Sequence, residues 1–180
     1  MTRIPGTALV LGGAKCVFDD LQAAQALFEP EFTVCVNDIV ELHEDCQHFA
    51  TVHPEFVGKW LTKRRKRGFP DPILWTANHR ISRNRESVFT FNCVESDNGS
   101  SGYLAVKVAQ FLGAKRIVLA GIPMKSEERH YFKEKGWTEA WMYLKAWEQD
   151  LTLKPTVRSF TGWTRDVYGL PTAEWLGMAK

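Results

Sequence analysis

The stretch from Asn98 to Met124 constrains the fold more than any other part of the chain. It reads as a polar glycine turn, an amphipathic helix, a short break and a buried strand. The apolar residues of the helix recur at helical spacing, at Leu104, Ala105, Val108, Phe111 and Leu112. Gly113 stands where a left-handed C-cap is expected, and Arg116–Ile122 then predicts a central parallel strand. This order of elements favours an α/β fold.

The start of this helix, Ser100-Ser101-Gly102, is a candidate anion site. Free backbone N–H groups and hydroxyls at a helix N-terminus suit a phosphate or a carboxylate. The alternative is a plain N-cap, in which the serines satisfy only the amides of the helix itself.

The N-terminal part of the chain repeats the pattern of strand, glycine turn and helix. The apolar run Thr7–Leu11 is followed by Gly12 and Gly13 and by an amphipathic segment, Val17–Phe28. Such a unit opens many nucleotide-binding α/β folds. The dinucleotide pattern G-x-G-x-x-G and the P-loop pattern are both missing, which argues against a conventional NAD site and against a P-loop kinase or ATPase.

Polar residues also follow two further predicted strands. Phe32–Val36 ends in Asn37, and Ala50–Val52 reads as a third strand with His53 at its tip. Ligands of open parallel sheets bind beyond the carboxyl ends of the strands, so these tips are expected to share one site. For Asn37 the alternative is an Asx turn that caps the next helix.

Length and composition fit one α/β domain over residues 1–180. We expect a Rossmann-like three-layer α/β/α architecture with a mostly parallel central sheet, because 180 residues with 44% hydrophobic content can fill one core and no linker divides them. A net charge of +2 is too balanced to indicate nucleic acid. No signal peptide or membrane span is visible, which predicts a cytoplasmic protein without a membrane partner.

Three other segments carry expectations about structure. The basic run Lys63–Arg67 is expected to be a solvated helix end, with contact to an anionic partner as the alternative. The histidines and cysteine within Glu41–His53 match no zinc spacing, so no metal site is predicted. Trp137–Leu151 is expected to be a helix whose apolar residues, among them Trp137, Trp141 and Leu151, face the core or an interface, with a ligand cage formed by the tryptophans as the alternative. An interface would fit a homo-oligomer.

Together, these motifs resemble those of a known family. The glycine turn at Gly12, Asn37 after the second strand, the Ser-Ser-Gly helix start and the Leu119–Ile122 strand resemble the Rossmann-like bacterial sialyltransferases of the lipooligosaccharide type. They are also similar to related flagellin-modifying motility proteins and archaeal pterin pyrophosphokinases. The order of motifs along the whole chain is similar to a set of small phage and bacterial proteins, a resemblance that implies no function.

The resemblance implies roles for individual residues. It assigns nucleotide and donor binding to Gly12, Gly13, Asn37, Ser100, Ser101 and Gly102. The predicted binding set also includes His53, at the tip of the third strand, and Gly121, near the end of the Arg116–Ile122 strand. It implies that His130, in the charged loop Lys125–Gly136, is the general base toward an acceptor hydroxyl. Lys125, Arg129 and Tyr131 would meet the departing phosphate.

The family pattern is incomplete in this chain. Ala14 follows the glycine pair where the family usually carries Gly-Pro-Ser, and Pro123 replaces an acidic residue that often follows the Gly-Ile pair. The motifs that are present still predict a nucleotide-binding transferase of the glycosyltransferase type. Its expected donor is a nucleotide-activated sugar, with a CMP-sugar as the first candidate, and no other cofactor is predicted. The alternative is a non-catalytic binding or assembly protein that keeps the fold, since a fold does not dictate a function.

Overall fold

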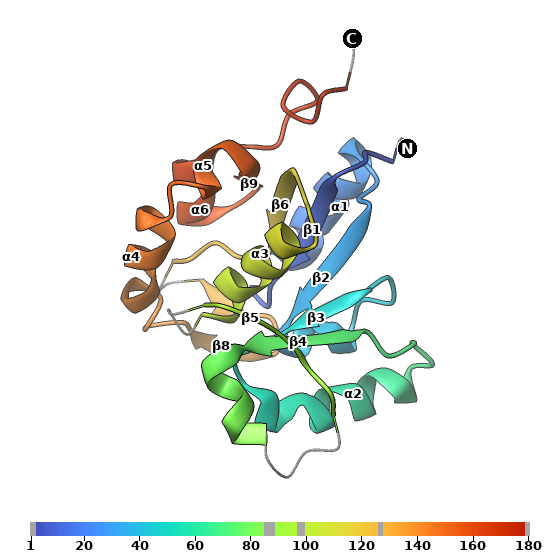
Figure 1. The fold of residues 1–180 in the computed structure, drawn as a ribbon. Coiled ribbons are helices and arrows are strands. Elements are labelled where there is room, and N and C mark those ends of the chain that lie inside the picture. The colour runs from blue at the N-terminus through green and yellow to red at the C-terminus, as the bar shows by residue number, and fades with distance from the viewer. Residues whose placement is uncertain (1–2, 85–88, 97–99, 126–127, 179–180) are drawn as a thin grey trace.

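The chain forms an α/β fold around one seven-stranded sheet (Figure 1), in a computed structural model that describes residues 3–84, 89–96, 100–125 and 128–178. The sheet strands are β1 (Thr7–Leu11), β2 (Phe32–Val36), β3 (His48–Ala50), β4 (Ile73–Ala77), β5 (Asn92–Val94), β6 (Arg116–Ala120) and β9 (Val157–Ser159). They lie in the order β5-β4-β3-β2-β1-β6-β9, and every neighbouring pair is parallel. The predicted Rossmann-like three-layer architecture is therefore confirmed.

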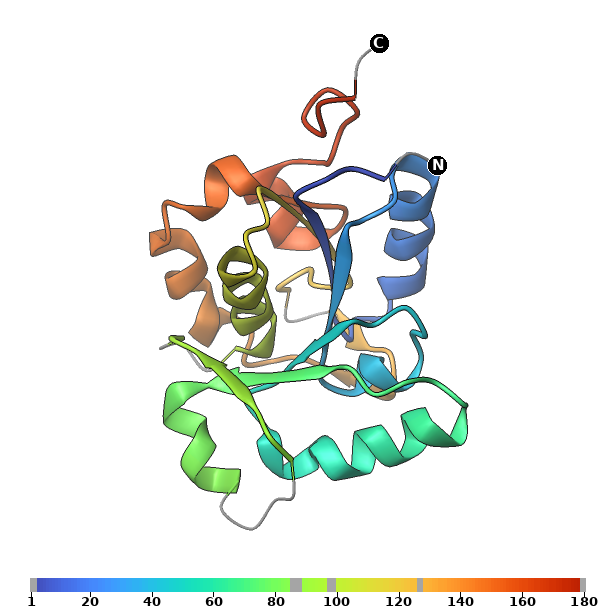
Figure 2. The same ribbon diagram turned by 45° about the vertical axis from the view of Figure 1, so that its right-hand side comes forward.

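Alternate residues of the strands point to two separate cores. Ala8 and Val10 of β1 face the layer that contains α3 (Ser101–Phe111), α4 (Trp141–Gln149), α5 (Leu153–Thr156) and α6 (Gly162–Tyr168). Leu9 and Leu11 face the layer that contains α1 (Val17–Leu27), α2 (Val57–Lys66) and the 3-10 turns η1 (Asn37–Glu41) and η2 (Pro54–Phe56). Figure 2 shows α1 and α3 on opposite sides of the sheet. Because both faces are covered, the central strands β1, β2 and β6 are mostly apolar.

The order of the strands reverses between β1 and β6. From β1 the chain builds β2 to β5 on one side, passes through a 3-10 turn η3 (Asn78–Asn84) between β4 and β5, and returns along α3 to β6 on the other side of β1. At the carboxyl ends of this central pair, the N–H of Gly12 donates to the carbonyl of Ala120 at 2.8 Å. In open α/β sheets such a reversal opens the crevice in which ligands bind.

Two predicted strands end or begin at other residues. β6 stops at Ala120, because Gly121 adopts a left-handed backbone with φ of 68° and turns the chain out of the sheet. The third strand is His48–Ala50 rather than Ala50–Val52. The hydroxyl of Thr51 accepts the N–H of His53 at 2.9 Å, which forms a local turn where the strand was expected to continue.

Helical periodicity alone misplaced three large apolar side chains. Phe111 belongs to the predicted buried stripe of α3, but it is 69% exposed, with its ring edge-on to that of Trp75. In the C-terminal segment the helix begins at Trp141, four residues later than expected, and Trp147 is the fully buried tryptophan while Trp141 and Leu151 are exposed. Trp147, and not Trp141, therefore packs into the core of this layer.

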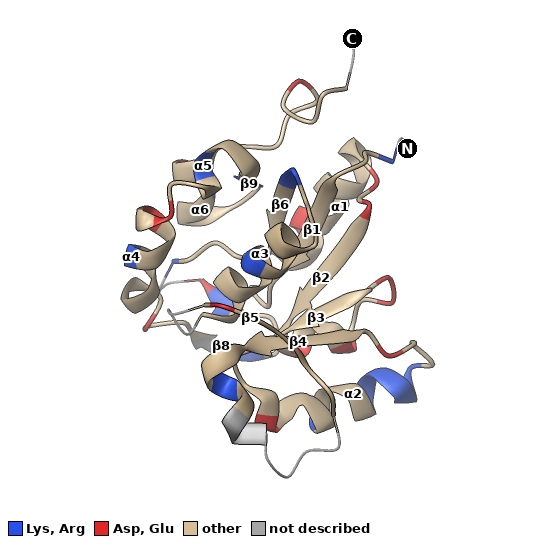
Figure 3. Ribbon diagram, in the orientation of Figure 1, with Lys and Arg blue, Asp and Glu red and all other residues tan. Residues whose placement is uncertain are grey.

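The basic run at the end of α2, visible in Figure 3, is not a solvated helix end throughout. Arg64 is fully buried, and its guanidinium donates to four backbone carbonyls, those of Val40, His43, Glu44 and Pro70, at 2.6–2.8 Å. Lys63 pairs with the buried Glu41 at 2.9 Å, and Arg65 pairs with Asp71. We name the buried part of this cluster the arginine corner: Arg64, the four residues whose carbonyls it binds, and the pair of Lys63 with Glu41.

Within the described residues, no helix is both long enough and apolar enough to cross a membrane.

Candidate functional site

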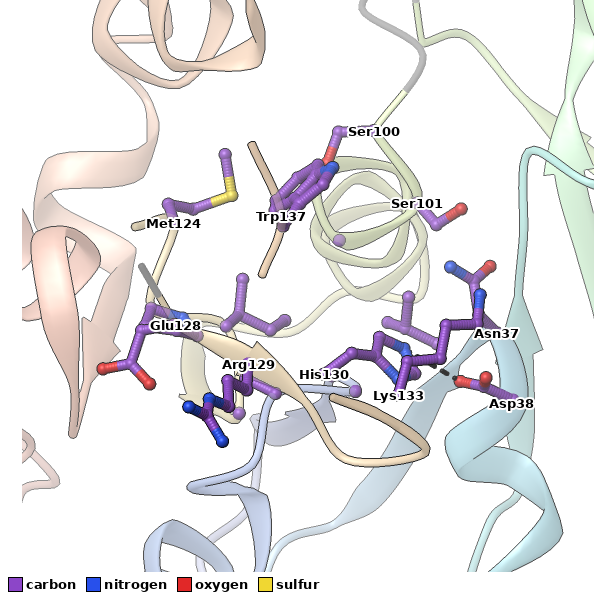
Figure 4. Close-up of a pocket in the computed structure, with 18 of the residues that line it drawn as sticks. Asn37, Asp38, Ser100, Ser101, Met124, Glu128, Arg129, His130, Lys133 and Trp137 are labelled. Atoms are coloured by element: carbon purple, nitrogen blue, oxygen red, sulfur yellow. Dashed lines mark ion pairs between the residues drawn. The ribbon is translucent and has the colours of Figure 1, made fainter. Parts of the chain in front are cut away.

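A pocket of about 500 Å³ lies at the carboxyl edge of the sheet, at the switch between β1 and β6 (Figure 4). The structure brings nearly all of the predicted site residues to its wall: Gly12, Gly13, Asn37, His53, Ser100, Ser101, Gly102, Gly121, Lys125, Arg129 and His130. Tyr131 is not among the lining residues and packs instead against Phe18, with ring centroids 5.0 Å apart. The structure thus brings together residues from five separate segments, while their roles remain predictions.

A two-stranded hairpin covers one side of the pocket. It consists of β7 (Arg129–His130) and β8 (Lys133–Gly136). Its attachment to the glycine turn uses only the backbone, since Lys15 N–H donates to Arg129 O at 2.8 Å and Tyr131 N–H donates to Gly13 O at 2.7 Å. The charged segment Lys125–Gly136 therefore contains this hairpin.

Gly13 has no room for a side chain on the face that meets His130. A Cβ atom at Gly13 would lie 2.6 Å from Nε2 of the imidazole. The glycine therefore lets the ring lie directly against the turn after β1. This is the reason why the turn needs glycine even though it lacks the dinucleotide pattern.

Both nitrogens of His130 already face a polar group. Nδ1 accepts the backbone N–H of Phe132 at 3.2 Å, and Nε2 lies 3.3 Å from Oδ1 of Asp38, the contact drawn as a dashed line in Figure 4. The approach to Asp38 is close enough for charge attraction, but it lacks the alignment of a hydrogen bond, so Oδ1 remains without a hydrogen-bond partner among the described residues. This arrangement fits the neutral tautomer with its proton on Nε2.

Asn37 is held in place by a buried threonine. It has a left-handed backbone with φ of 54°, which asparagine tolerates better than most residues. Its Oδ1 accepts the hydroxyl of Thr51 at 2.8 Å, and that hydroxyl in turn accepts His53 N–H. The amide nitrogen Nδ2 has no hydrogen-bond acceptor within the described part of the chain, so it can donate to a ligand in the pocket.

The start of α3 brings further donors to the same pocket. Ser100 is the N-cap, and its hydroxyl accepts Tyr103 N–H at 3.5 Å. The hydroxyl of Ser101 accepts the buried N–H of Val52 at 3.1 Å, which leaves its own hydrogen available to donate. The N–H groups of Ser101 and Gly102 meet no acceptor in the described ranges. A helix N-terminus of this kind carries partial positive charge and favours an anion.

A buried carboxylate supports the tip of β6 from behind the pocket. Asp20 of α1 accepts the N–H of Gly121 at 2.8 Å and the hydroxyl of Thr161. Burial raises the pKa of Asp20. Burial, with a smaller effect of Asp20, raises the pKa of the neighbouring Cys16 to about 12. The thiol therefore stays protonated near neutral pH and is a poor nucleophile.

Three cationic side chains reach the wall of the pocket: Lys125, Arg129 and Lys133. Lys125 Nζ lies 3.9 Å from Asp166 in a pair whose two side chains are both more than a third exposed, so the pair is weak. Lys133 is exposed and has no ion-pair partner among the residues described; it lies beside His130 in Figure 4. Asp38, Glu128 and Glu139 line the same pocket, so its wall carries charges of both signs and the anion preference rests on the start of α3.

Sequence reasoning missed several pocket residues. Asp38 follows β2 directly, so the strand-tip rule that selected Asn37 could have found it. Lys133 and Trp137 carry no such signal, because they reach the pocket only through the hairpin. Met124 also lines the pocket and has a left-handed backbone with φ of 53°, which is rare for a methionine. Strained backbone of this kind clusters at functional sites.

Among the described residues, no three or more His, Cys, Asp or Glu side chains lie together in a way that could hold a metal ion. No protein-family model matches the chain, and no curated protein or solved structure matches it significantly.

Proposed function

We propose that the pocket binds a nucleotide and that the protein is a nucleotide-binding transferase of the glycosyltransferase type. The donor would be a nucleotide-activated sugar, with a CMP-sugar as the first to test. One observation carries this proposal: hydrogen-bond donors without acceptors in the described fold converge on one pocket at the switch between β1 and β6. These donors are Asn37 Nδ2 and the N–H groups of Ser101 and Gly102.

The arrangement suits a nucleoside phosphate in a definite orientation. The residue after β2 in such folds usually contacts the ribose or base, a role that Asn37 can fill through Nδ2. The phosphate would meet Ser101 and Gly102, with Lys133 close to the same wall. A nucleotide would then join two sequence-distant elements, β2 and α3.

The test is binding to a panel of CMP, UDP, GDP, ADP and NAD, measured by thermal shift and calorimetry. A nucleotide at 100 times its Kd adds about 2.7 kcal/mol to the free energy of unfolding. For a chain of this size that raises Tm by roughly 5–10 °C. No response to any of the five nucleotides would contradict the donor part of the proposal.

A matched pair of variants tests the site itself. Asn37→Gly keeps the left-handed backbone and removes the amide, so we expect the affinity for the best nucleotide to fall about tenfold, the loss of roughly one hydrogen bond. Asn78 is the control, because it also follows a strand and begins a 3-10 turn but lies outside the pocket. Asn78→Gly should leave the affinity unchanged.

In this proposal Nδ1 of His130 would release the N–H of Phe132 and accept the proton of the acceptor hydroxyl as that oxygen attacks the donor sugar. The bond between the sugar and the phosphate breaks, and the phosphate leaves with the electron pair toward Lys125 or Arg129. Asp38 would stabilise the imidazolium that forms. We expect His130→Ala to abolish turnover while the nucleotide Kd changes less than about twofold. Loss of both together would instead make His130 a binding or folding residue.

A second candidate function is a non-catalytic binding or assembly protein. It is favoured by the contacts of His130, because Nδ1 is occupied by Phe132 N–H and Nε2 faces Asp38, so neither nitrogen is free to accept a proton. Pull-down and size-exclusion measurements distinguish the two functions, since a scaffold should retain a protein partner without any small ligand.

A further inference from the structure

Trp137 forms an aromatic wall at one end of the pocket. It follows β8, lines the pocket and is 37% exposed. The ring of Tyr143, from α4, stacks against the indole with ring centroids 5.4 Å apart and an interplanar angle of 22°. One face of the indole is thus covered and its orientation is fixed by the stack, so a flat ligand can pack against it at little cost in side-chain entropy.

The neighbours of Trp137 leave room for a ring and supply an acceptor. Gly102 and Gly136 line the same pocket without side chains. Glu139 also lines it, is exposed, and has no ion-pair partner in the described part of the structure. An indole face packs well against the C–H groups of a sugar ring, and a carboxylate accepts hydrogen bonds from its hydroxyls. A phosphate is disfavoured next to this carboxylate.

The order of groups along the pocket distinguishes a sugar from a nucleobase. In Figure 4, Asn37 lies at one side, Ser101 and Ser100 follow at the start of α3, and Trp137 lies beyond them. If the ribose or base meets Asn37 and the phosphate meets the start of α3, the group that reaches Trp137 is the one attached to the far side of the phosphate. In an activated donor that group is the sugar.

We propose that Trp137, supported by Tyr143 and accompanied by Glu139, forms a subsite for the saccharide ring of a nucleotide-activated sugar. This inference rests on the proposed function, because it assumes that the phosphate lies at the start of α3. It identifies the ligand class as a polyhydroxylated ring joined through phosphate to a nucleoside. Trp137 would then make the affinity for a nucleotide-sugar higher than the affinity for the nucleotide alone.

The experiment compares each nucleotide with its sugar conjugate by calorimetry: CMP with CMP-N-acetylneuraminic acid, UDP with UDP-glucose, and GDP with GDP-mannose. In the wild-type protein, one conjugate should bind more tightly than its nucleotide. Trp137→Ala should weaken that conjugate about tenfold and leave the nucleotide within about twofold. Trp137→Phe, which keeps a ring, should fall between the two. Trp141→Ala is the matched control, because Trp141 is 70% exposed and does not line the pocket.

The outcomes separate this inference from the proposed function. If a nucleotide binds and Trp137→Ala weakens nucleotide and conjugate equally, the indole stacks on the base and the inference is wrong. If Trp137→Ala weakens neither, the subsite does not exist, although the nucleotide site stands. If no nucleotide or conjugate binds the wild-type protein, the proposed function fails and the inference fails with it.

Discussion

The two ends of η1 lie in polar surroundings of opposite character. Its first residues, Asn37 and Asp38, line the pocket, and neither Asn37 Nδ2 nor the buried Asp38 Oδ1 has a hydrogen-bond partner among the described residues. Its last residues, Val40 and Glu41, belong to the arginine corner, where Arg64 and Lys63 bind carbonyl and carboxylate oxygens. The short turn η1 thus joins a cluster whose polar groups lack hydrogen-bond partners to a cluster whose polar groups have them.

The difference shows how a structural polar cluster can be told from a functional one. Burying a charge is tolerated only when its hydrogen bonds are made, and Arg64 makes four. The pocket keeps its donors unpaired because water or a ligand can satisfy them. Changes in the corner should therefore alter stability, and changes in the pocket should alter binding.

The largest effect is expected from Arg64→Met. Methionine keeps part of the apolar stem but leaves buried carbonyls, among them Val40 O, without a donor. We expect a loss of about 3–5 kcal/mol in the free energy of unfolding, measured by urea titration. The control is Arg65→Met, which removes only an exposed pair with Asp71 and should cost little. Equal losses in the two variants would show that the corner is not a stabilising cluster.

Gly121→Ala should have the next largest effect. The residue has φ of 68°, and a Cβ atom there would lie 2.6 Å from Val17 Cβ and 2.7 Å from Gly12 O. Backbone strain and overpacking together should cost about 2–4 kcal/mol. Gly113→Ala shares the left-handed backbone, with φ of 89°, but meets nothing within 4 Å, so it should cost only about 1–2 kcal/mol. Chemical denaturation gives the free energy of unfolding of both variants, and the difference between their losses is the part caused by steric overlap.

A smaller effect is expected from Ser101→Ala. The substitution leaves the buried N–H of Val52 without its acceptor and should cost about 1–2 kcal/mol of stability. It also removes a donor from the pocket, so the affinity for a bound nucleotide should fall severalfold. Calorimetry on the folded variant measures the second effect. A loss of stability without any loss of nucleotide affinity would show that Ser101 stabilises the fold and does not bind the ligand.

The smallest effect concerns pH. Burial lowers the pKa of His43 in the arginine corner; Asp45 opposes this and Arg64 adds to it. Because the folded pKa lies below the ordinary value of 6.5, the unfolded chain binds the proton first. The contribution of His43 is therefore complete above about pH 6.5 and is lost as the pH falls through the folded value. Urea midpoints between pH 7 and 5 should fall less steeply for His43→Gln than for the wild-type protein.

Amino-acid patterns were a good guide where the backbone alone decides the result. Apolar runs such as Phe32–Val36 form parallel strands, and parallel strands bring their carboxyl ends to one edge of the sheet. Gly12, Asn37 and Ser101 could therefore be grouped into one site from their places in the chain. The glycine at the end of α3 was also predictable, since its left-handed backbone has few alternatives.

Tertiary contacts decided the rest. A run of five basic residues does not reveal that its second member, Arg64, turns inward to carbonyls of a distant loop. The face of α4 was misjudged because Trp141 and Trp147 are equally apolar, and packing against Tyr103 of α3 and Tyr168 of α6 selects Trp147. Trp137 reaches the pocket through a hairpin whose pairing with Gly13 leaves no periodic pattern in the sequence.

The hairpin β7–β8 is joined to the glycine turn by peptide groups and not by side chains. Hairpin side chains add further contacts, because Tyr131 packs against Phe18, His130 lies 3.3 Å from Asp38, and Lys63 Nζ lies over the ring of Phe132. The peptide hydrogen bonds do not involve the side chains of Lys133 and Trp137, so both can be exchanged without loss of this attachment. In the proposed function, the sheet edge would hold the phosphate and the hairpin would contact the group attached to it. Grafting altered hairpins onto this frame is a direct route to changed ligand selectivity.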